Sequence, residues 1–186
     1  MSVVSADLNA CFRRRKGDSR DRIVVSGLAD QGGSPAEAED SIFFLVTRIA
    51  EETNIGAGPG VGGSPALIPR LRPPMHLNLH VMFASLYRHY ETGLQALDEI
   101  IAYLQAKPVY TLENTPAMDA ALGTMAFKMI SLDYAQQSYL WGSLGAKYVP
   151  SVIYSLRVLS VGQEQVEALE PPVTQPRAKG QPGALS

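Results

Sequence analysis

One stretch decides the fold of this chain: Arg72-Pro-Pro-Met-His-Leu-Asn-Leu-His-Val-Met-Phe-Ala84. Its prolines form a rigid turn, and from Met75 onward the residues of one face are all apolar, which predicts a β-strand. The same design, a turn followed by a strand, returns in Leu140-Trp-Gly-Ser-Leu-Gly-Ala-Lys-Tyr-Val-Pro-Ser-Val-Ile-Tyr154. Neither stretch carries a catalytic nucleophile, a cluster of metal ligands or a phosphate loop, so both specify shape. We expect the following residues to specify the fold: Pro73, Pro74, Asn78, Trp141, Gly142, Gly145 and Pro150.

Further strands are expected on either side of these stretches. The stretch at residues 22–28 is short and rich in β-branched residues, which predicts a strand. Residues 41–49 are apolar at nearly every position, which is typical of a central strand covered on both faces. Residues 124–132 place Met125, Phe127 and Met129 on one side. The Val149-Pro150 pair favours an extended backbone and therefore begins a final strand, residues 151–161.

Three helices are expected between the strands. Residues 3–15 form a short helix with Val4, Leu8, Cys11 and Phe12 on one side. Asp133 and Gln136 have the spacing of a capping box, which predicts a short helix through Leu140 and Trp141 that ends at Gly142 or Gly145. The longest helix ends at Lys107-Pro108, and its apolar positions follow helical spacing: Leu86, Tyr90, Leu94, Leu97, Ile101 and Leu104.

Together these elements predict an α+β fold: a mixed, mainly antiparallel β-sheet packed by one long and one or two short helices. We expect one domain over residues 1–162, with a flexible Gly/Pro-rich loop at about residues 54–74. Residues 163–186 are rich in Pro and Gln and predict an extended or disordered tail, with a short helix around residues 164–169 as its one regular element.

The composition of the chain excludes several classes of protein. The chain has 186 residues, 46% of them hydrophobic, and a formal charge of −2, which is far from the basic balance of a dedicated nucleic-acid binder. The single Cys11 excludes an internal disulfide framework and suits a reducing cytosol. We expect no membrane span and no export signal, since no apolar run reaches ~20 residues and the N-terminus lacks an apolar core.

Two motifs that could bind small ligands are weak here. Gly58-Pro-Gly-Val-Gly-Gly63 satisfies G-x-G-x-x-G, but Pro65 and Pro69 follow it in place of the helix that would hold a pyrophosphate. His76 and His80 lie on one face of a strand about 13 Å apart, which is too far to share a metal ion. A third ligand such as His89 would still leave one strand histidine out of reach. No cofactor is therefore expected, and the histidines are predicted to face a subunit seam or solvent.

The remaining charged residues form no catalytic constellation. Glu51-Glu52 and Asp98-Glu99 are adjacent in sequence and point in different directions, and no G-x-S-x-G elbow is present, so we expect no enzymatic activity. The one basic run, Arg13, Arg14, Arg15 and Lys16, is either a solvated helix end or a contact for an anionic protein partner.

Several segments together resemble the short-form tail-terminator, or cap, proteins of phage-tail-like extracellular contractile injection systems. The similarity covers about residues 8–160, and its most specific block surrounds Trp141 and Pro150. The chain departs from the family in a shorter start and in having His76 and His80 where aliphatic, aromatic or polar residues are more frequent. The segments that carry the resemblance are 73–79, 90–110, 114–116 and 140–154, with Asp21-Arg-Ile-Val-Val-Ser26 and the loop after Asn54.

The resemblance implies a tail-terminator-like fold and a structural protein. Such a protein would form a ring, with a hexamer as the expected form, that stops the inner tube and the sheath and closes the far end of the particle. Its partners would be the sheath and inner-tube proteins, with assembly in the bacterial cytoplasm. Two alternatives remain: a tail-completion adaptor of an ordinary phage, and a small-ligand-binding protein that uses the loop at Gly58 to Gly63.

Overall fold

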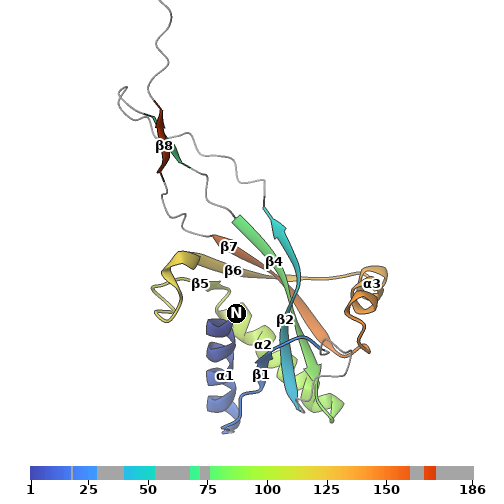
Figure 1. The fold of residues 1–186 in the computed structure, drawn as a ribbon. Helices are drawn as coiled ribbons and strands as arrows, with labels where there is room; N and C mark the ends of the chain where they lie inside the picture. The colour runs from blue at the N-terminus through green and yellow to red at the C-terminus, as the bar shows by residue number, and fades with distance from the viewer. Residues whose placement is uncertain (18, 29–39, 53–67, 72–75, 160–165, 171–186) are drawn as a thin grey trace, which may run out of the picture. The chain divides into compact units, whose positions relative to one another are not determined.

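The computed structural model describes residues 1–17, 19–28, 40–52, 68–71, 76–159 and 166–170 (Figure 1). Its main sheet has six strands in the order β1-β2-β4-β7-β6-β5. All neighbouring pairs are antiparallel except β1 and β2. The expected α+β class is confirmed. The strands are β1 (Ile23–Val25), β2 (Ser41–Glu51), β4 (His76–Leu86), β5 (Val109–Tyr110), β6 (Thr124–Ile130) and β7 (Ser151–Leu159).

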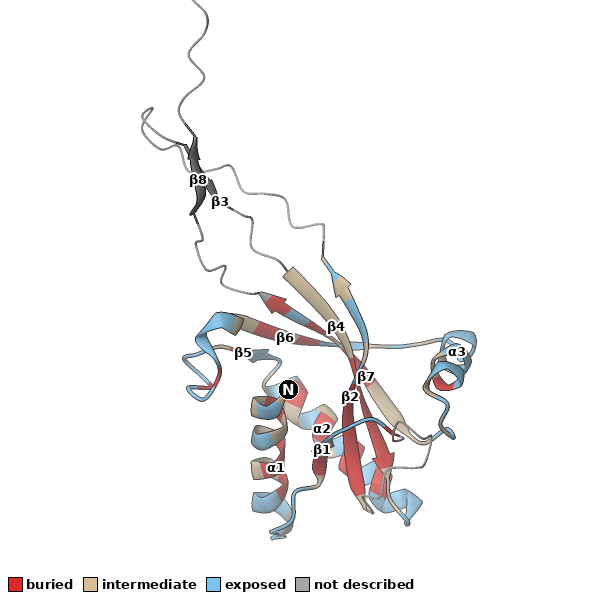
Figure 2. Ribbon diagram, viewed as in Figure 1, coloured by how far each residue is buried: buried red, intermediate tan, exposed pale blue. Residues whose placement is uncertain are grey.

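One face of the sheet is covered by two helices, α1 (Ser2–Lys16) and α2 (Tyr90–Ala106). The buried residues of α1 lie on its side toward the sheet (Figure 2). The expected apolar stripe of α1 is confirmed, because Val4, Leu8 and Phe12 belong to the main core. The two helices are joined at Asp7, whose Oδ2 accepts hydrogen bonds from Tyr103 at 2.8 Å and from Lys107 at 2.6 Å.

A ladder of five aromatic rings crosses this core from strand to strand. Phe44 on β2 stacks on Phe83 on β4 with ring centroids 4.4 Å apart, and Tyr154 on β7 meets the edge of Phe83 at 6.0 Å. Phe127 on β6 continues the ladder at 6.2 Å from Tyr154, and Tyr110 on β5 ends it at 5.6 Å from Phe127. Each ring is buried, so the ladder joins five neighbouring strands through one continuous set of contacts.

The packing face of helix α2 matches the expected one only in part. Leu86 belongs to β4, and Tyr90 and Leu94 are exposed, whereas the buried positions are Gly93, Ala96, Leu97, Ile100 and Leu104. The expected stripe was right at Leu97 and Leu104 and wrong at its start, because its spacing was counted from a residue of the strand. Small residues line the true face: a Cβ on Gly93 would clash with Ser85 Oγ, so glycine lets the helix approach β4 closely.

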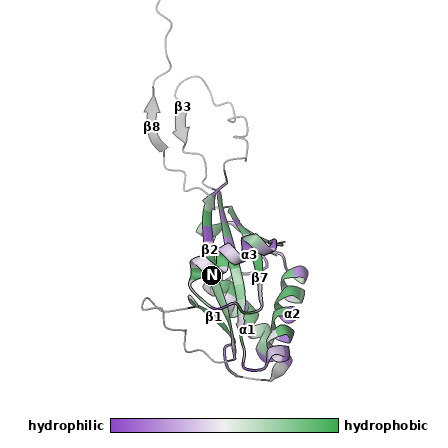
Figure 3. Cartoon of the chain, turned by 90° about the vertical axis from the view of Figure 1, so that its right-hand side faces the viewer, coloured by the Kyte–Doolittle hydropathy of each residue, from purple (hydrophilic) through white to green (hydrophobic). Residues whose placement is uncertain are grey.

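On the second face of the sheet lies α3 (Tyr134–Leu144), which stands in front of the sheet in Figure 3, while α2 lies beside it. The predicted capping box is confirmed: Asp133 Oδ1 accepts from the Gln136 backbone N–H at 2.7 Å, and Gln136 Oε1 accepts from the Asp133 N–H at 3.1 Å. Of the two candidate end residues, Gly145 closes the helix in the left-handed conformation, with φ 62°. Trp141 is the single buried residue of α3 and packs in a second core with Phe43, Met82 and Ile153.

Two short strands lie where the sequence predicts a loop and a tail. β3 (Ile68–Leu71) pairs antiparallel with β8 (Val166–Glu170), with Ile68 opposite Glu170. The short helix expected around residues 164–169 is therefore wrong, since a helix of this length is unstable alone and pairing with a distant strand supplies the hydrogen bonds.

The chain forms two compact units, residues 1–55 with 74–161 and residues 56–73 with 162–186. Our single domain over residues 1–162 stays a prediction; Pro73, Pro74 and Gly58 to Gly63 lie outside the described residues.

Trp141→Ala should lower the free energy of unfolding by about 3–5 kcal/mol, because it removes a large buried ring and leaves a cavity. The side chain is 6% exposed, and urea unfolding followed by far-UV circular dichroism measures the loss. Tyr139→Ala is the matched control: it lies on the same helix at 79% exposure and should change stability by about 0.5 kcal/mol or less. A loss below about 1 kcal/mol for Trp141→Ala would contradict the core role of this residue.

Candidate interface surfaces

The basic run at the end of α1 divides into two parts. Arg13 is bound within the fold, because its Nη1 lies 2.8 Å from Asp21 Oδ1. Arg14 and Arg15 are exposed, and Lys16 is the last residue of the helix before Gly17, which closes it with φ 64°. Positive charges at a helix C-terminus are favoured by the helix dipole. The two exposed arginines are therefore the part of this cluster best placed to meet an acidic partner.

A row of polar residues crosses the second face of the sheet beyond the Trp141 core. Arg48 on β2 pairs in register with His80 on β4, His80 with Ser155 on β7, and Ser155 with Lys128 on β6. The row exists because β2 has a bulge between Val46 and Arg48, which turns the arginine to the same side as His80. Thr47, within the bulge, donates from Oγ1 to the His80 carbonyl at 3.2 Å. A bulge of this kind could not be foreseen from the alternation of residues.

A second polar row lies next to the first, toward the end of the sheet. Arg157 on β7 forms a two-point ion pair with Glu52, with Nε 2.9 Å from Oε2. This hydrogen bond with Arg157 holds the pKa of Glu52 below its ordinary value. Ser155 donates from Oγ to Asn78 Oδ1 at 2.6 Å, so Asn78, which we expected to specify the fold, ties β4 to β7. These contacts link β7 to β4 and to Glu52 outside the apolar core.

His76 and His80 both lie on β4, and their side chains are on the same face of the strand, as the sequence predicted. Burial, and next to it the charge of Arg48, lowers the pKa of His80 from its ordinary value of 6.5. His76 Nδ1 is buried without a hydrogen-bond partner among the described residues. Within the same residues, no three His, Cys, Asp or Glu side chains are grouped so that they could hold a metal ion. The interface role of His76 and His80 stays a prediction.

The third surface was not predicted from the sequence and consists of aromatic residues around α3. Tyr134 is 94% exposed and Tyr148 is 60% exposed, and the Tyr148 ring meets the edge of Trp141 at 5.3 Å. An open hollow of about 490 Å³ is lined by Tyr134, Gln137, Ser138, Trp141 and Tyr148. We call these five residues the aromatic hollow. Its sequence signal was weak, because Tyr134 and Tyr148 belong to no periodic pattern.

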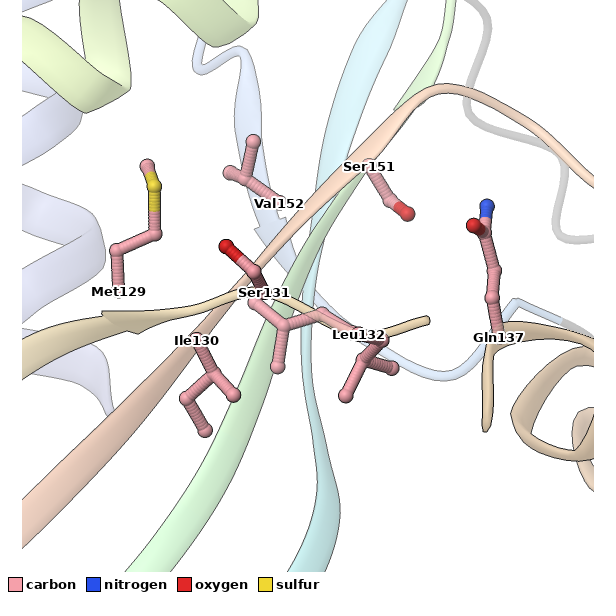
Figure 4. A pocket seen from close by; sticks show the side chains of 8 residues that line it. Met129, Ile130, Ser131, Leu132, Gln137, Ser151 and Val152 are labelled. Atoms are coloured by element: carbon pink, nitrogen blue, oxygen red, sulfur yellow. The ribbon is translucent and has the colours of Figure 1, made fainter. Parts of the chain in front are cut away.

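A second hollow of about 260 Å³ adjoins the aromatic hollow at Gln137, which lines both. It lies between the end of β6, the start of β7 and α3, with Gln137 on the helix side and Ser151 on the β7 side (Figure 4). Apolar residues from both strands line it, among them Ile130 and Val152. Extended, shallow hollows next to exposed tyrosines are typical of protein contacts.

Within the described ranges, no helix is both long and apolar enough to cross a bilayer.

Two solved structures of tube-terminating proteins share this fold. The PVC sheath/tube terminator of an extracellular contractile injection system, in the extended state, is similar at a TM-score of 0.54 and 15% identity, over 100% of this chain and 65% of that chain. The tube-terminating cap of the anti-feeding prophage is similar at a TM-score of 0.50 and 15% identity, over 95% of this chain and 62% of that chain. The chain therefore has a tail-terminator fold and spans about two thirds or less of each terminator's length.

The family of the chain follows from its sequence. Residues 4–175 match the Pvc16 N-terminal domain family, so the chain belongs to that family. This match confirms the resemblance to cap proteins of contractile injection systems that the segments around Trp141 and Pro150 carry. No curated protein matches the sequence of the chain.

Stability should fall between pH 7.5 and pH 5.5 partly because of His80. The folded protein lowers the pKa of His80, so below about pH 6.5 the unfolded chain takes up a proton that the folded chain resists. Stability from this residue is thus present at higher pH and is lost as the pH falls. His80→Gln should reduce the difference between urea midpoints at the two pH values. Equal differences in wild type and His80→Gln would exclude this contribution.

Proposed function

We propose that this protein is a structural cap that forms a ring, terminates the inner tube and contractile sheath of a phage-tail-like injection system, and closes the particle's far end. The observation that carries the proposal is the family match over residues 4–175, and the shared terminator fold supports it. The related terminators are described as sheath/tube and tube-terminating proteins, so sheath and inner tube are the proposed partners. Assembly takes place in the bacterial cytoplasm, and the role is structural, without a cofactor or nucleic acid.

The described surfaces are consistent with the demands on a ring subunit. A closed ring uses head-to-tail contacts, so two different surfaces of each copy must fit each other. The polar rows of the sheet, the aromatic hollow and the α1 end are three chemically different surfaces on one subunit. The proposed contact with sheath or tube is the α1 end, where Arg14 and Arg15 would meet acidic side chains.

The purified protein should assemble into closed rings, with a hexamer as the expected form. Light scattering gives the mass of the assembly, and negative-stain microscopy shows whether it is closed. Purified sheath and tube are added in a second sample, because binding can drive ring closure by mass action. A strict monomer at high concentration that also forms no ring with sheath and tube would contradict the proposal.

Reversing the charges at the α1 end should prevent docking and leave the fold intact. Arg14→Glu with Arg15→Glu changes two exposed residues, and such substitutions usually alter stability by about 0.5 kcal/mol or less. Like charges at an interface cost several kcal/mol, so the cap should fail to bind and sheath lengths should become heterogeneous. Electron microscopy of assembled particles measures these lengths.

The control for charge reversal is Lys147→Glu, which reverses an exposed charge outside α1. Particles with this variant should keep a uniform length. If particles with the α1 variant are also uniform and capped, the basic run is a solvated helix end and docking uses another surface. A normal melting temperature for both variants excludes misfolding as the cause.

A further inference from the structure

We propose that the aromatic hollow beside α3 is a docking site for the proline-rich C-terminal segment, Pro171 to Pro182, of a neighbouring copy of this chain. The inference rests on the proposed function, because it assumes the ring and assigns one of the contacts between its subunits. The surface is the aromatic hollow, and the segment is defined by its amino-acid sequence.

The hollow has the chemistry of a site for proline-rich peptides. Its rim carries two exposed tyrosines, Tyr134 and Tyr148, and Trp141 lies between them and the core. Gln137 and Ser138 add side chains that can donate hydrogen bonds to main-chain carbonyls. Grooves lined by tyrosine and tryptophan with a few polar donors bind proline-rich chains in the polyproline II form. This lining has more aromatic residues than helix packing requires, since Tyr134 is 94% exposed.

The C-terminal segment fits this site by composition. It contains Pro171, Pro172, Pro176 and Pro182, and the carbonyls of such a sequence have no local hydrogen-bond donors in the polyproline II form. The only charged residues of the segment are Arg177 and Lys179, and cations are attracted to the faces of aromatic rings. The absence of acidic residues from positions 171–186 therefore favours an aromatic site.

The direction of β7 favours a neighbouring copy as the source of the segment. β7 begins at Ser151, which lines the hollow adjoining the aromatic hollow, and ends at Leu159. Eight steps along a strand span about 26 Å, so Leu159 lies at the opposite end of β7 from Ser151, which lines the adjoining hollow. Head-to-tail contacts in a ring bring a surface of one copy against a different surface of the next. The aromatic hollow supplies such a surface.

The chemistry of the site can be tested through Trp141, the single tryptophan of the chain. In the full chain with Pro171→Ala, Pro172→Ala and Pro176→Ala, the hollow is open to a synthetic peptide of residues 170–186, which contains no aromatic residue. Titration of this peptide should change the Trp141 emission to a saturating value, and a peptide with the same alanines should not. Adding Tyr134→Ala should weaken binding by about tenfold or more.

Tyr139→Ala is the matched control for the titration. Tyr139 is also an exposed tyrosine of α3, but it does not line the hollow. Its removal should leave the affinity for the peptide unchanged. An emission that does not saturate, or equal effects of Tyr134→Ala and Tyr139→Ala, would overturn the proposal.

The source of the segment can be tested by disulfide cross-linking in the full chain. Cys11→Ser removes the native thiol, and Ser138→Cys in the hollow and Thr174→Cys in the segment supply the pair. After mild oxidation, dimers and larger products on a non-reducing gel would support docking between copies. Cross-linking within monomers alone, or no cross-linking, would overturn it. Each single-cysteine chain is the control for random contacts, because neither can extend beyond a dimer.

The results separate this inference from the proposed function. Rings that cap sheath normally but form no cross-link contradict the docking site and leave the cap function in place. Copies that cross-link in a series but do not terminate sheath support the docking site and contradict the cap function.

Discussion

The structure depends on the ladder of aromatic rings that crosses the main core. Phe44, Phe83, Tyr154, Phe127 and Tyr110 place one ring on each of five neighbouring strands. A slip of one residue in any strand would turn its ring to the opposite face, so the ladder penalises every wrong register. The helices α1 and α2 then pack on a surface whose pattern is already fixed. Burial raises the pKa of Tyr154 to about 12, so the ladder stays uncharged over the working range of pH.

The same register determines the surfaces on the other side of the sheet. Side chains alternate between faces, so aligning the aromatic residues on one face also aligns His80, Ser155 and Lys128 on the other, and the bulge in β2 adds Arg48 to that row. Phe43, Met82 and Ile153 form the second core near α3, and the polar rows begin where that core ends. Among the residues that the structure describes, one helix covers this face with one buried side chain, Trp141, which leaves room for contacts with other chains. The core and the candidate interfaces are thus two results of one alignment.

The sequence predicted those elements whose signals are local. The strands at residues 41–51, 76–86 and 124–130 follow from apolar patterns, and the helix after Asp133 follows from its capping box. The packing face of α2 was predicted at Leu97 and Leu104 but not at Gly93 and Ala96, because such small residues give little hydrophobic signal, although Gly93 allows a close approach to β4. The pairing of β3 with β8 depends on residues about one hundred positions apart, and no local pattern contains it. The sequence identified Arg13 as a candidate interface residue but not its ion pair with Asp21. The aromatic hollow could not be predicted either, because it depends on the fold bringing Tyr148 against Trp141.

Asn9 controls how the main sheet ends. This buried side chain accepts hydrogen bonds from the backbone N–H groups of Arg22 and Ile23 at 2.9 and 2.8 Å and donates to the Ile23 carbonyl at 3.0 Å. It thus occupies the backbone groups of Ile23, the first residue of β1, and the strand at the opposite edge, β5, is two residues long. Exposed strand edges are templates for uncontrolled pairing between chains. Both edge strands are short, three residues in β1 and two in β5, which limits uncontrolled pairing along them and favours contacts through side-chain surfaces that can distinguish one partner from another.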